Sequence, residues 1–298
     1  MYSNPRQKTN SYAVQIIMTT PIVLDTDGSV LPLTSEQRYN LREFEETVRF
    51  GCSMKDWRKF SASMPSIPKN ACVFTGSGDF HHLTLELLSR CSDEPFDLLV
   101  FDNHPDDMRY LFGIHCGSWI SHAAKLPFVK SIKVVGISSS DAALPHFYEI
   151  RMRPLWQKKL QFWTVGVKSD WMNFVAPKGS AHSFDSPKSL VDALIPELER
   201  SQRIYVSVDK DVFSKQVVAT DWDQGLFEFE DAEKIISSCR TKIIASDVCG
   251  DCSSYTYKSR FKRFLSGLDG QSQTDPRLMP EIKNNHRIIN EKLLSLLS

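Results

Sequence analysis

The chain has 298 residues, and its composition is that of a folded protein. Hydrophobic residues make up 41% and charged residues 24%, which excludes a disordered chain. The 36 basic residues equal the 36 acidic ones, so the net charge is zero and a broad nucleic-acid-binding surface is not expected. The sequence also lacks a run of about 18 apolar residues, so it predicts no membrane-spanning helix.

The N-terminus and the cysteines indicate where the protein resides. The apolar run at residues 13–18 is too short for a secretory signal. Seven cysteines are scattered along the chain, which is typical of reduced thiols rather than of a disulfide framework. We therefore expect a cytoplasmic protein with no membrane or nucleic-acid partner.

Short β-rich runs alternate with helical patterns. The pattern from Thr34 to Gln37 resembles a capping box, and it predicts a helix with Leu41, Phe44 and Val48 on one face. The predicted strands cover residues 71–75, 97–101, 131–137, 161–165, 203–208 and 241–245. The later helices are predicted over residues 189–200, where Pro196 kinks or shortens the helix, 230–239 and 281–297.

This alternation predicts an α/β fold of three layers, α/β/α, with a mostly parallel central sheet. Residues 1–298 are expected to form a single domain. Residues 1–33 are difficult to assign, and residues 138–186 form a loop-rich insertion around one buried strand. Ligands of such folds bind beyond the carboxyl ends of the strands.

Three segments place potential metal ligands directly after predicted strands. At a spacing of two, extended residues point to the same side, so their side chains can converge on one point. The residues are Asp102, His104 and Asp106 after one strand, Asp209 and Asp211 after another, and the tandem His81 and His82 after a glycine turn.

Each segment also has a simpler interpretation. A single aspartate after a strand often caps a helix, and a single histidine is often only a hydrogen-bonded polar group. Several carboxylates gathered at three strand ends would repel one another unless a cation neutralised them. Carboxylate-rich sites with one imidazole per ion favour Mn²⁺, with Zn²⁺, Co²⁺ or Fe²⁺ as alternatives.

The order of these motifs resembles that of the arginase (ureohydrolase) family. The family carries a Gly-Gly-Asp-His turn, an Asp-x-His-x-Asp strand end and a Ser-x-Asp-x-Asp strand end. This chain has GSGDFHH at residues 76–82, DNHPD at 102–106 and SVDKD at 207–211. The GIHCG segment at 113–117 and the GLFE segment at 225–228 resemble two further family segments, so the resemblance covers roughly residues 70–250.

The resemblance implies a centre of two divalent ions, with Mn²⁺ as the first choice. Asp102 and Asp209 would bridge the ions. Asp106 and one of the tandem histidines would complete the ligands of the first ion. His81 is favoured by the helix that follows, and His82 remains an alternative because this chain has one residue more than the family before the ligand.

The resemblance also implies ligands for the second ion and a residue that carries protons. His104 and Asp211 would complete the second ion's ligands. His115 would be a catalytic proton shuttle at the mouth of the site, since an imidazole titrates near neutral pH.

The substrate end of the motif departs from the family. Asp247 matches the first acid of the family's Asp-x-x-Glu and is expected to be catalytic, but Gly250 stands where the glutamate would hold a guanidinium. Asp251 could replace it only if the backbone shifts by one residue. The loop after Asp106 is also short and apolar, so arginine is not the expected substrate.

Cys249 and Cys252 form a C-x-x-C pattern beside Asp247. A redox pair needs a thioredoxin-like context, and a zinc site needs two further ligands. Neither is evident, so we treat the pattern as coincidental, although it is expected to lie close to the metals.

We therefore expect a binuclear metal-dependent hydrolase. It would cleave a C–N bond of a small guanidino, amidino or amide compound by attack of a metal-bridging hydroxide. A metal-binding protein of the same fold without hydrolase activity is the alternative, and Gly250 favours it. A phosphoesterase ranks third because its Gly-Asn-His segment is missing. The family's trimers and hexamers also imply self-association.

Overall fold

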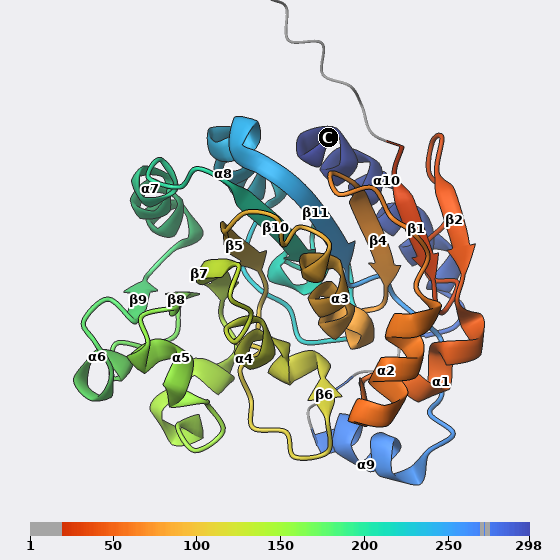
Figure 1. Ribbon diagram of the computed structural model, residues 1–298, viewed down its shortest axis with the longest axis horizontal. Helices are drawn as coiled ribbons and strands as arrows, with labels where there is room; N and C mark the ends of the chain where they lie inside the picture. The colour runs from red at the N-terminus through yellow and green to blue at the C-terminus, as the bar shows by residue number, and fades with distance from the viewer. Residues whose placement is uncertain (1–19, 269–270, 272–274) are drawn as a thin grey trace, which may run out of the picture.

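A nine-stranded sheet, parallel throughout, organises the computed structural model, which describes residues 20–268, 271 and 275–298 (Figure 1). The strand order is β2-β1-β4-β11-β10-β5-β7-β8-β9. The strands are β1 (Ile22–Asp25), β2 (Gln37–Asn40), β4 (Cys72–Gly76), β5 (Phe96–Phe101), β7 (Val129–Ile137), β8 (Leu160–Val165), β9 (Ala181–Phe184), β10 (Ile204–Asp209) and β11 (Ile243–Cys249). The apolar run at residues 13–18 lies outside the described residues.

Helices cover both faces of the sheet, which confirms the expected three-layer fold (Figure 1). One face carries α1 (Glu45–Val48), α2 (Met54–Ser63), α3 (Thr84–Ser89), α4 (Trp119–Ala123), α5 (Met152–Trp156) and α6 (Met172–Val175). The other face carries α7 (Pro187–Leu198), α8 (Phe229–Cys239) and α10 (Met279–Leu297). A further helix, α9 (Arg260–Leu268), lies near a short antiparallel pair of β3 (Gly51–Cys52) and β6 (Ile114–His115).

Alternation along the central strands explains why both faces are covered. In β5, Leu98 and Val100 belong to the hydrophobic core on one face, whereas Leu99 and Phe101 belong to the core on the other. All four are buried. A strand that is apolar on both sides must be covered on both sides, and so the apolar run at this position specifies a central parallel strand. Within the described part of the chain, no helix is long and apolar enough to span a bilayer.

The helix predicted from the capping-box pattern begins later than expected. Gln37–Asn40 is an edge strand, β2, that pairs with β1, and it is followed by a 3₁₀ turn at Arg42–Phe44 and by the short α1. Leu41, Phe44 and Val48 pack against the same hydrophobic core, as expected. Arg38 forms ion pairs with Glu36 and with Asp25 of β1, and the β1 backbone takes up the hydrogen bonds that a helix would have satisfied internally. Tertiary pairing therefore overrides the local helical pattern.

Two further boundaries differ from the prediction. The strand expected at residues 241–245 begins at Ile243 and continues to Cys249, and it includes the buried Asp247, whose Oδ1 atom accepts two hydrogen bonds. Residues 138–186 contain a second strand, β9, as well as the expected β8, and the short helices α5 and α6. In the edge strand β9, buried and exposed side chains do not alternate clearly, so its sequence resembles that of a loop.

Candidate metal centre

The strands β4, β11, β10 and β5 are neighbours in the middle of the sheet (Figure 1). The expected ligands gather at the carboxyl ends of these strands. Strand β5 leads into Asp102, and β10 ends at Asp209. Strand β4 leads into a 3₁₀ helix, Gly78–Leu83, that carries His81. Parallel strands end at the same edge, so segments far apart in the sequence meet at one location.

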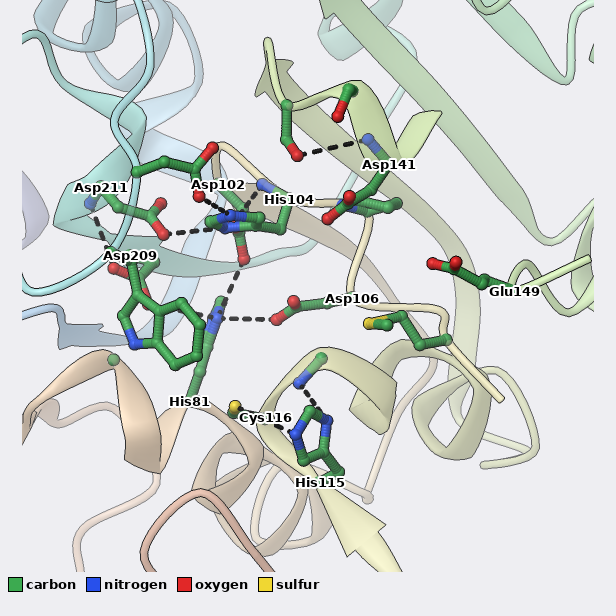
Figure 2. Close-up of a pocket in the computed structure, with 18 of the residues that line it drawn as sticks. His81, Asp102, His104, Asp106, His115, Cys116, Asp141, Glu149, Asp209 and Asp211 are labelled. Carbon is green, nitrogen blue, oxygen red and sulfur yellow. Dashed lines mark hydrogen bonds and ion pairs between the residues drawn. The ribbon is translucent and has the colours of Figure 1, made fainter. Parts of the chain in front are cut away.

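The first group of ligand atoms surrounds the imidazole of His81 (Figure 2). Its Nδ1 atom lies 3.0 Å from Oδ2 of Asp102 and 3.1 Å from Oδ2 of Asp106. A third carboxylate oxygen, Oδ2 of Asp209, lies 3.6 Å away. Two ligands about 2.1 Å from an ion and at right angles are about 3 Å apart, so these separations suit a single metal ion.

The second group surrounds His104 (Figure 2). Its Nδ1 atom lies 2.9 Å from Oδ2 of Asp211 and 3.5 Å from Oδ1 of Asp102. Asp102 thus offers one oxygen to each group. The structure brings together the six residues expected as ligands, and Asp102 belongs to both groups.

Both histidines are oriented by their other ring nitrogen. The Nε2 atom of His81 lies 3.0 Å from the Ser207 hydroxyl, and that of His104 lies 2.6 Å from Oδ1 of Asp223. Such partners direct the opposite nitrogen toward a metal. Asp223 was not expected from the sequence, where its position in the loop after the second Asp pair is the only signal.

The spacing of two has a local cause in each strand end. Oδ1 of Asp102 accepts a hydrogen bond from the backbone N–H of His104 at 2.7 Å. Oδ1 of Asp209 accepts one from the backbone N–H of Asp211 at 3.1 Å. Each first aspartate therefore closes a tight turn that returns the third residue to the same side as the first.

Two observations at the first group favour a cation. The buried Nδ1 of His81 and Oδ2 of Asp102 have no hydrogen-bond partner, although they lie close together. Asp106 is a non-glycine residue at φ +47°, and the indole N–H of Trp119 donates to its Oδ2 atom at 2.7 Å. Unsatisfied buried atoms and a strained backbone are both costly, and an ion held by these atoms would compensate for them.

The electrostatics of the carboxylates support the same interpretation. Burial, together with the charge of Asp102, raises the pKa of Asp106. Burial and the neighbouring Asp209 raise the pKa of Asp211 well above its usual range. Burial alone would lower the pKa of His81, but the nearby carboxylates outweigh it and raise the pKa well above 6.5. Each of these raised pKa values favours a bound proton where several carboxylates crowd together. A metal cation bound among them would balance the same negative charge.

Metal binding is therefore expected to stabilise the protein more as the pH rises. The raised pKa values of His81 and His104 mean that their protonation stabilises the metal-free fold below about pH 6.5, and that this stability is lost as the pH rises through the folded pKa. Each proton that the metal displaces adds up to about 1.4 kcal/mol of metal-dependent stability per pH unit. Urea unfolding with Mn²⁺ and with EDTA at pH 6.5, 7.5 and 8.5 measures this, and a difference that does not change with pH would contradict it.

The tandem histidines lie in different environments. His81 faces the carboxylates, whereas His82 is buried beside Trp57, with ring centroids 5.9 Å apart. Burial lowers the pKa of His82 well below 6.5. His81, and not the alternative His82, therefore faces the carboxylates, and its role as a metal ligand stays a prediction.

Asp247 lies behind the site rather than in it. Its Oδ1 atom accepts hydrogen bonds from Thr84 at 2.9 Å and from Ser207 at 2.8 Å, and it does not line the pocket. The Ser207 hydroxyl in turn contacts His81. Asp247 therefore reaches His81 only through Ser207, and its expected catalytic role stays a prediction.

The structure provides no place for the family's glutamate. Gly250 has φ +89°, and a Cβ atom there would lie 2.4 Å from Oδ1 of Asp209. Asp251, the alternative, points away from the pocket: its Oδ2 atom pairs with Nζ of Lys210 at 2.7 Å, and its Oδ1 atom accepts from Asn290 at 3.1 Å. A carboxylate for a guanidinium must come from elsewhere.

His115 forms part of the pocket wall (Figure 2). Strand β6 holds it, and its ring packs against Phe50 and Tyr110 at centroid distances of 4.2 and 4.9 Å. Its Nδ1 atom accepts a hydrogen bond from the backbone N–H of Gly117 at 3.0 Å. Burial lowers the pKa of His115 to about 3, so the ring is neutral, and its role as a proton shuttle stays a prediction.

A cavity of about 560 Å³ opens above the two groups. Besides the ligands, it is lined by the carboxylates of Asp141, Glu149 and Asp223, and the described residues around it include no lysine or arginine. None of these three acids was expected from the sequence. Asp141 follows the end of β7, which is the positional signal that could have identified it.

No family model matches the chain, and no curated protein does. One similar solved structure is the agmatine ureohydrolase of Thermoplasma volcanium, with 17% identity over 75% of this chain and 64% of that chain, and a TM-score of 0.44. The arginase of Medicago truncatula has 15% identity over 76% of this chain and 60% of that chain, and a TM-score of 0.43. The proclavaminate amidino hydrolase of Streptomyces clavuligerus has 17% identity over 73% of this chain and 65% of that chain, and a TM-score of 0.42. The chain spans about six-tenths of the length of these proteins.

The architecture follows from the chain's own sheet, in which the expected ligands meet at the carboxyl ends of adjacent parallel strands. The motifs that resemble the arginase family lie at these strand ends. The chain thus has an α/β fold of three layers around a parallel central sheet.

Proposed function

We propose that the chain is a metal-dependent hydrolase that cleaves a C–N bond of a small cationic guanidino or amidino compound. The observation that carries the proposal is the pair of imidazole–carboxylate groups that share Asp102 at the floor of the cavity. Two divalent ions, with Mn²⁺ proposed first, would lower the pKa of a bound water and polarise the substrate. The seven cysteines are all buried and none pairs in a disulfide among the described residues, which supports a reducing, cytoplasmic location.

The chain's own residues prepare the reaction in two ways. Ser207 and Asp223 fix the rings of His81 and His104, so the ligand atoms need little reorganisation. Above them, Asp141 and Glu149 place negative charge on the wall of the cavity. A cation would be attracted to this wall, and its reacting carbon would lie over the metal groups.

The cavity also indicates which cations fit. A substrate carboxylate needs an arginine, a lysine or an array of N–H donors, and the described lining includes neither basic residue. The carboxylates that line the cavity would also repel a carboxylate on the substrate. We therefore propose substrates that carry a cationic head without a carboxylate.

Agmatine and arginine form a matched pair for a test because they differ only by the carboxylate. With Mn²⁺-loaded protein, we expect urea release from agmatine with a kcat/KM at least about 100-fold above that for arginine, which corresponds to about 3 kcal/mol of repulsion and lost hydrogen bonding. Glu149→Gln should weaken binding of the cation while it leaves the metal content unchanged. Arginine as the better substrate would contradict the charge argument.

A metal-binding protein without hydrolase activity is the second candidate. Gly250 favours it, because no side chain can extend toward the substrate from that position. A screen of guanidino, amidino and amide compounds distinguishes the two. Fully metal-loaded protein that binds a cation but releases no product from any of them would replace the hydrolase proposal.

A further inference from the structure

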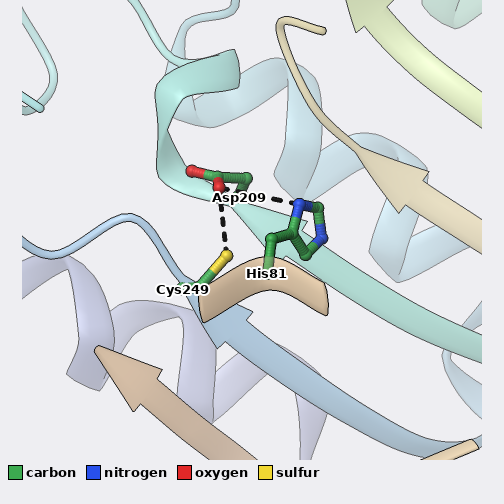
Figure 3. A group of neighbouring side chains, drawn as sticks. All are labelled: His81, Asp209 and Cys249. Atoms are coloured by element: carbon green, nitrogen blue, oxygen red, sulfur yellow. Dashed lines mark hydrogen bonds and ion pairs between the residues drawn. The ribbon is translucent and has the colours of Figure 1, made fainter. Parts of the chain in front are cut away.

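A cysteine thiol lies directly beside the first group of ligands (Figure 3). Cys249 ends strand β11, where it is the register partner of Asp209 on β10. Its Sγ atom lies 3.1 Å from Oδ2 of Asp209, and the side chain is fully buried. The thiol therefore approaches a carboxylate expected to bind metal.

The thiol and the imidazole share this carboxylate oxygen. Oδ2 of Asp209 is the same atom that lies 3.6 Å from Nδ1 of His81, and the sulfur, oxygen and nitrogen all lie within 4.8 Å of one another. Figure 3 shows the side chains of Cys249 and His81 meeting at Asp209 from two different elements. The Nδ1 atom of His81 is buried and makes no hydrogen bond, so a further partner is needed in this space.

The contact distance suits two ligands of one ion. With a metal–sulfur distance of about 2.3 Å and a metal–oxygen distance of about 2.1 Å, neighbouring ligands at right angles are about 3.1 Å apart. The observed separation of Sγ and Oδ2 is 3.1 Å. Cys252, the other member of the C-x-x-C pattern, instead donates to the carbonyl of Ala219, so the two thiols have separate roles.

We infer that Cys249 is a ligand of the ion held by His81, Asp102, Asp106 and Asp209, an inference that rests on the proposed function. On coordination, the sulfur–metal bond forms and the thiol proton, which Asp209 now accepts, leaves to solvent. Thiolate is a soft donor, and it favours Zn²⁺ or Co²⁺ over Mn²⁺. The two ion positions would thus differ: one with a thiolate, and the other, at His104 and Asp211, with nitrogen and oxygen donors.

Cobalt titration of the metal-free full chain tests this without measuring activity. We expect two ions to bind, with a thiolate-to-cobalt charge-transfer band in the near ultraviolet that saturates after one of them. Cys249→Ser should remove this band. Since the loss of an outer partner already costs about 10- to 100-fold in metal affinity, the loss of a ligand atom should weaken Co²⁺ and Zn²⁺ binding at this position by at least as much.

Serine is a stringent replacement because its hydroxyl can still donate to Asp209. A thiol that only positions this carboxylate would therefore be replaced with little loss of affinity. Cys116→Ser is the matched control, since Cys116 also lines the cavity, and it should retain the band. Two bound Co²⁺ ions without a thiolate band, or a band that survives Cys249→Ser, would overturn the inference alone. Absence of Co²⁺ binding would overturn both the inference and the proposed function.

Discussion

Replacing both Asp102 and Asp209 with asparagine is expected to abolish metal binding and hydrolysis. Asp102 offers an oxygen to each of the two groups, and Asp209 contacts the first one. An asparagine keeps the size of the side chain but removes the charge and one of the two carboxylate oxygens. Two imidazoles with the remaining carboxylates cannot then hold two dications, because the charge that balances them is halved.

We expect the metal content of the purified double variant to fall from near two ions per chain to near zero, and turnover to fall by at least about 10³-fold. Elemental analysis and product assays measure the two effects. Far-ultraviolet circular dichroism shows whether the variant is folded, and Asp141→Asn, which removes a cavity carboxylate outside the ligand groups, should keep both ions. Turnover by the metal-free double variant would place the reaction elsewhere.

Replacing Lys210 with methionine should destabilise the fold strongly. Lys210 and Asp251 are fully buried, and their Nζ and Oδ2 atoms lie 2.7 Å apart. Removal of one partner leaves an uncompensated buried charge, which costs about 3–5 kcal/mol. Because Lys210 lies between two expected ligands, urea unfolding should be measured in EDTA, so that altered metal binding does not contribute.

A double variant separates charge from packing. Lys210→Met with Asp251→Leu removes both charges and should recover much of the loss, since well-packed apolar pairs often replace buried ion pairs at little cost. The exposed pair of Arg200 and Glu197 serves as the control, and Arg200→Met should change the free energy of unfolding by less than about 1 kcal/mol. A loss below about 1 kcal/mol for Lys210→Met would show that Asp251 finds another partner.

This ion pair explains why Asp251 could not be assigned from the sequence. Asp251 is one residue from Gly250, so a small backbone shift would direct it to the cavity. The positive φ of Gly250 instead turns the chain, and the partners Lys210 and Asn290 come from distant segments. Local sequence patterns contain no information on such distant partners. Because both charges are buried, the ion pair with Lys210 fixes the direction in which the Asp251 side chain points.

The sequence alone determined the parts that depend on local periodicity. Apolar runs predicted the central strands, since a strand covered on both faces must be apolar on both, as in β5. The spacing of two at Asp102 and His104, or at Asp209 and Asp211, predicted convergent side chains, because each pair is joined by a local turn. The edge strands β2 and β9 were missed because they lack a continuous apolar run, and the short β1 was missed in the unassigned segment of residues 1–33.

Only the tertiary structure decided how these local parts are used. It directed His81 rather than His82 to the carboxylates, and it placed Asp247 behind His81. It also brought Cys249 to the same carboxylate as His81. Each outcome depends on which strands are neighbours in the sheet, and neighbouring strands such as β10 and β11 are joined by hydrogen bonds between segments that no local pattern connects.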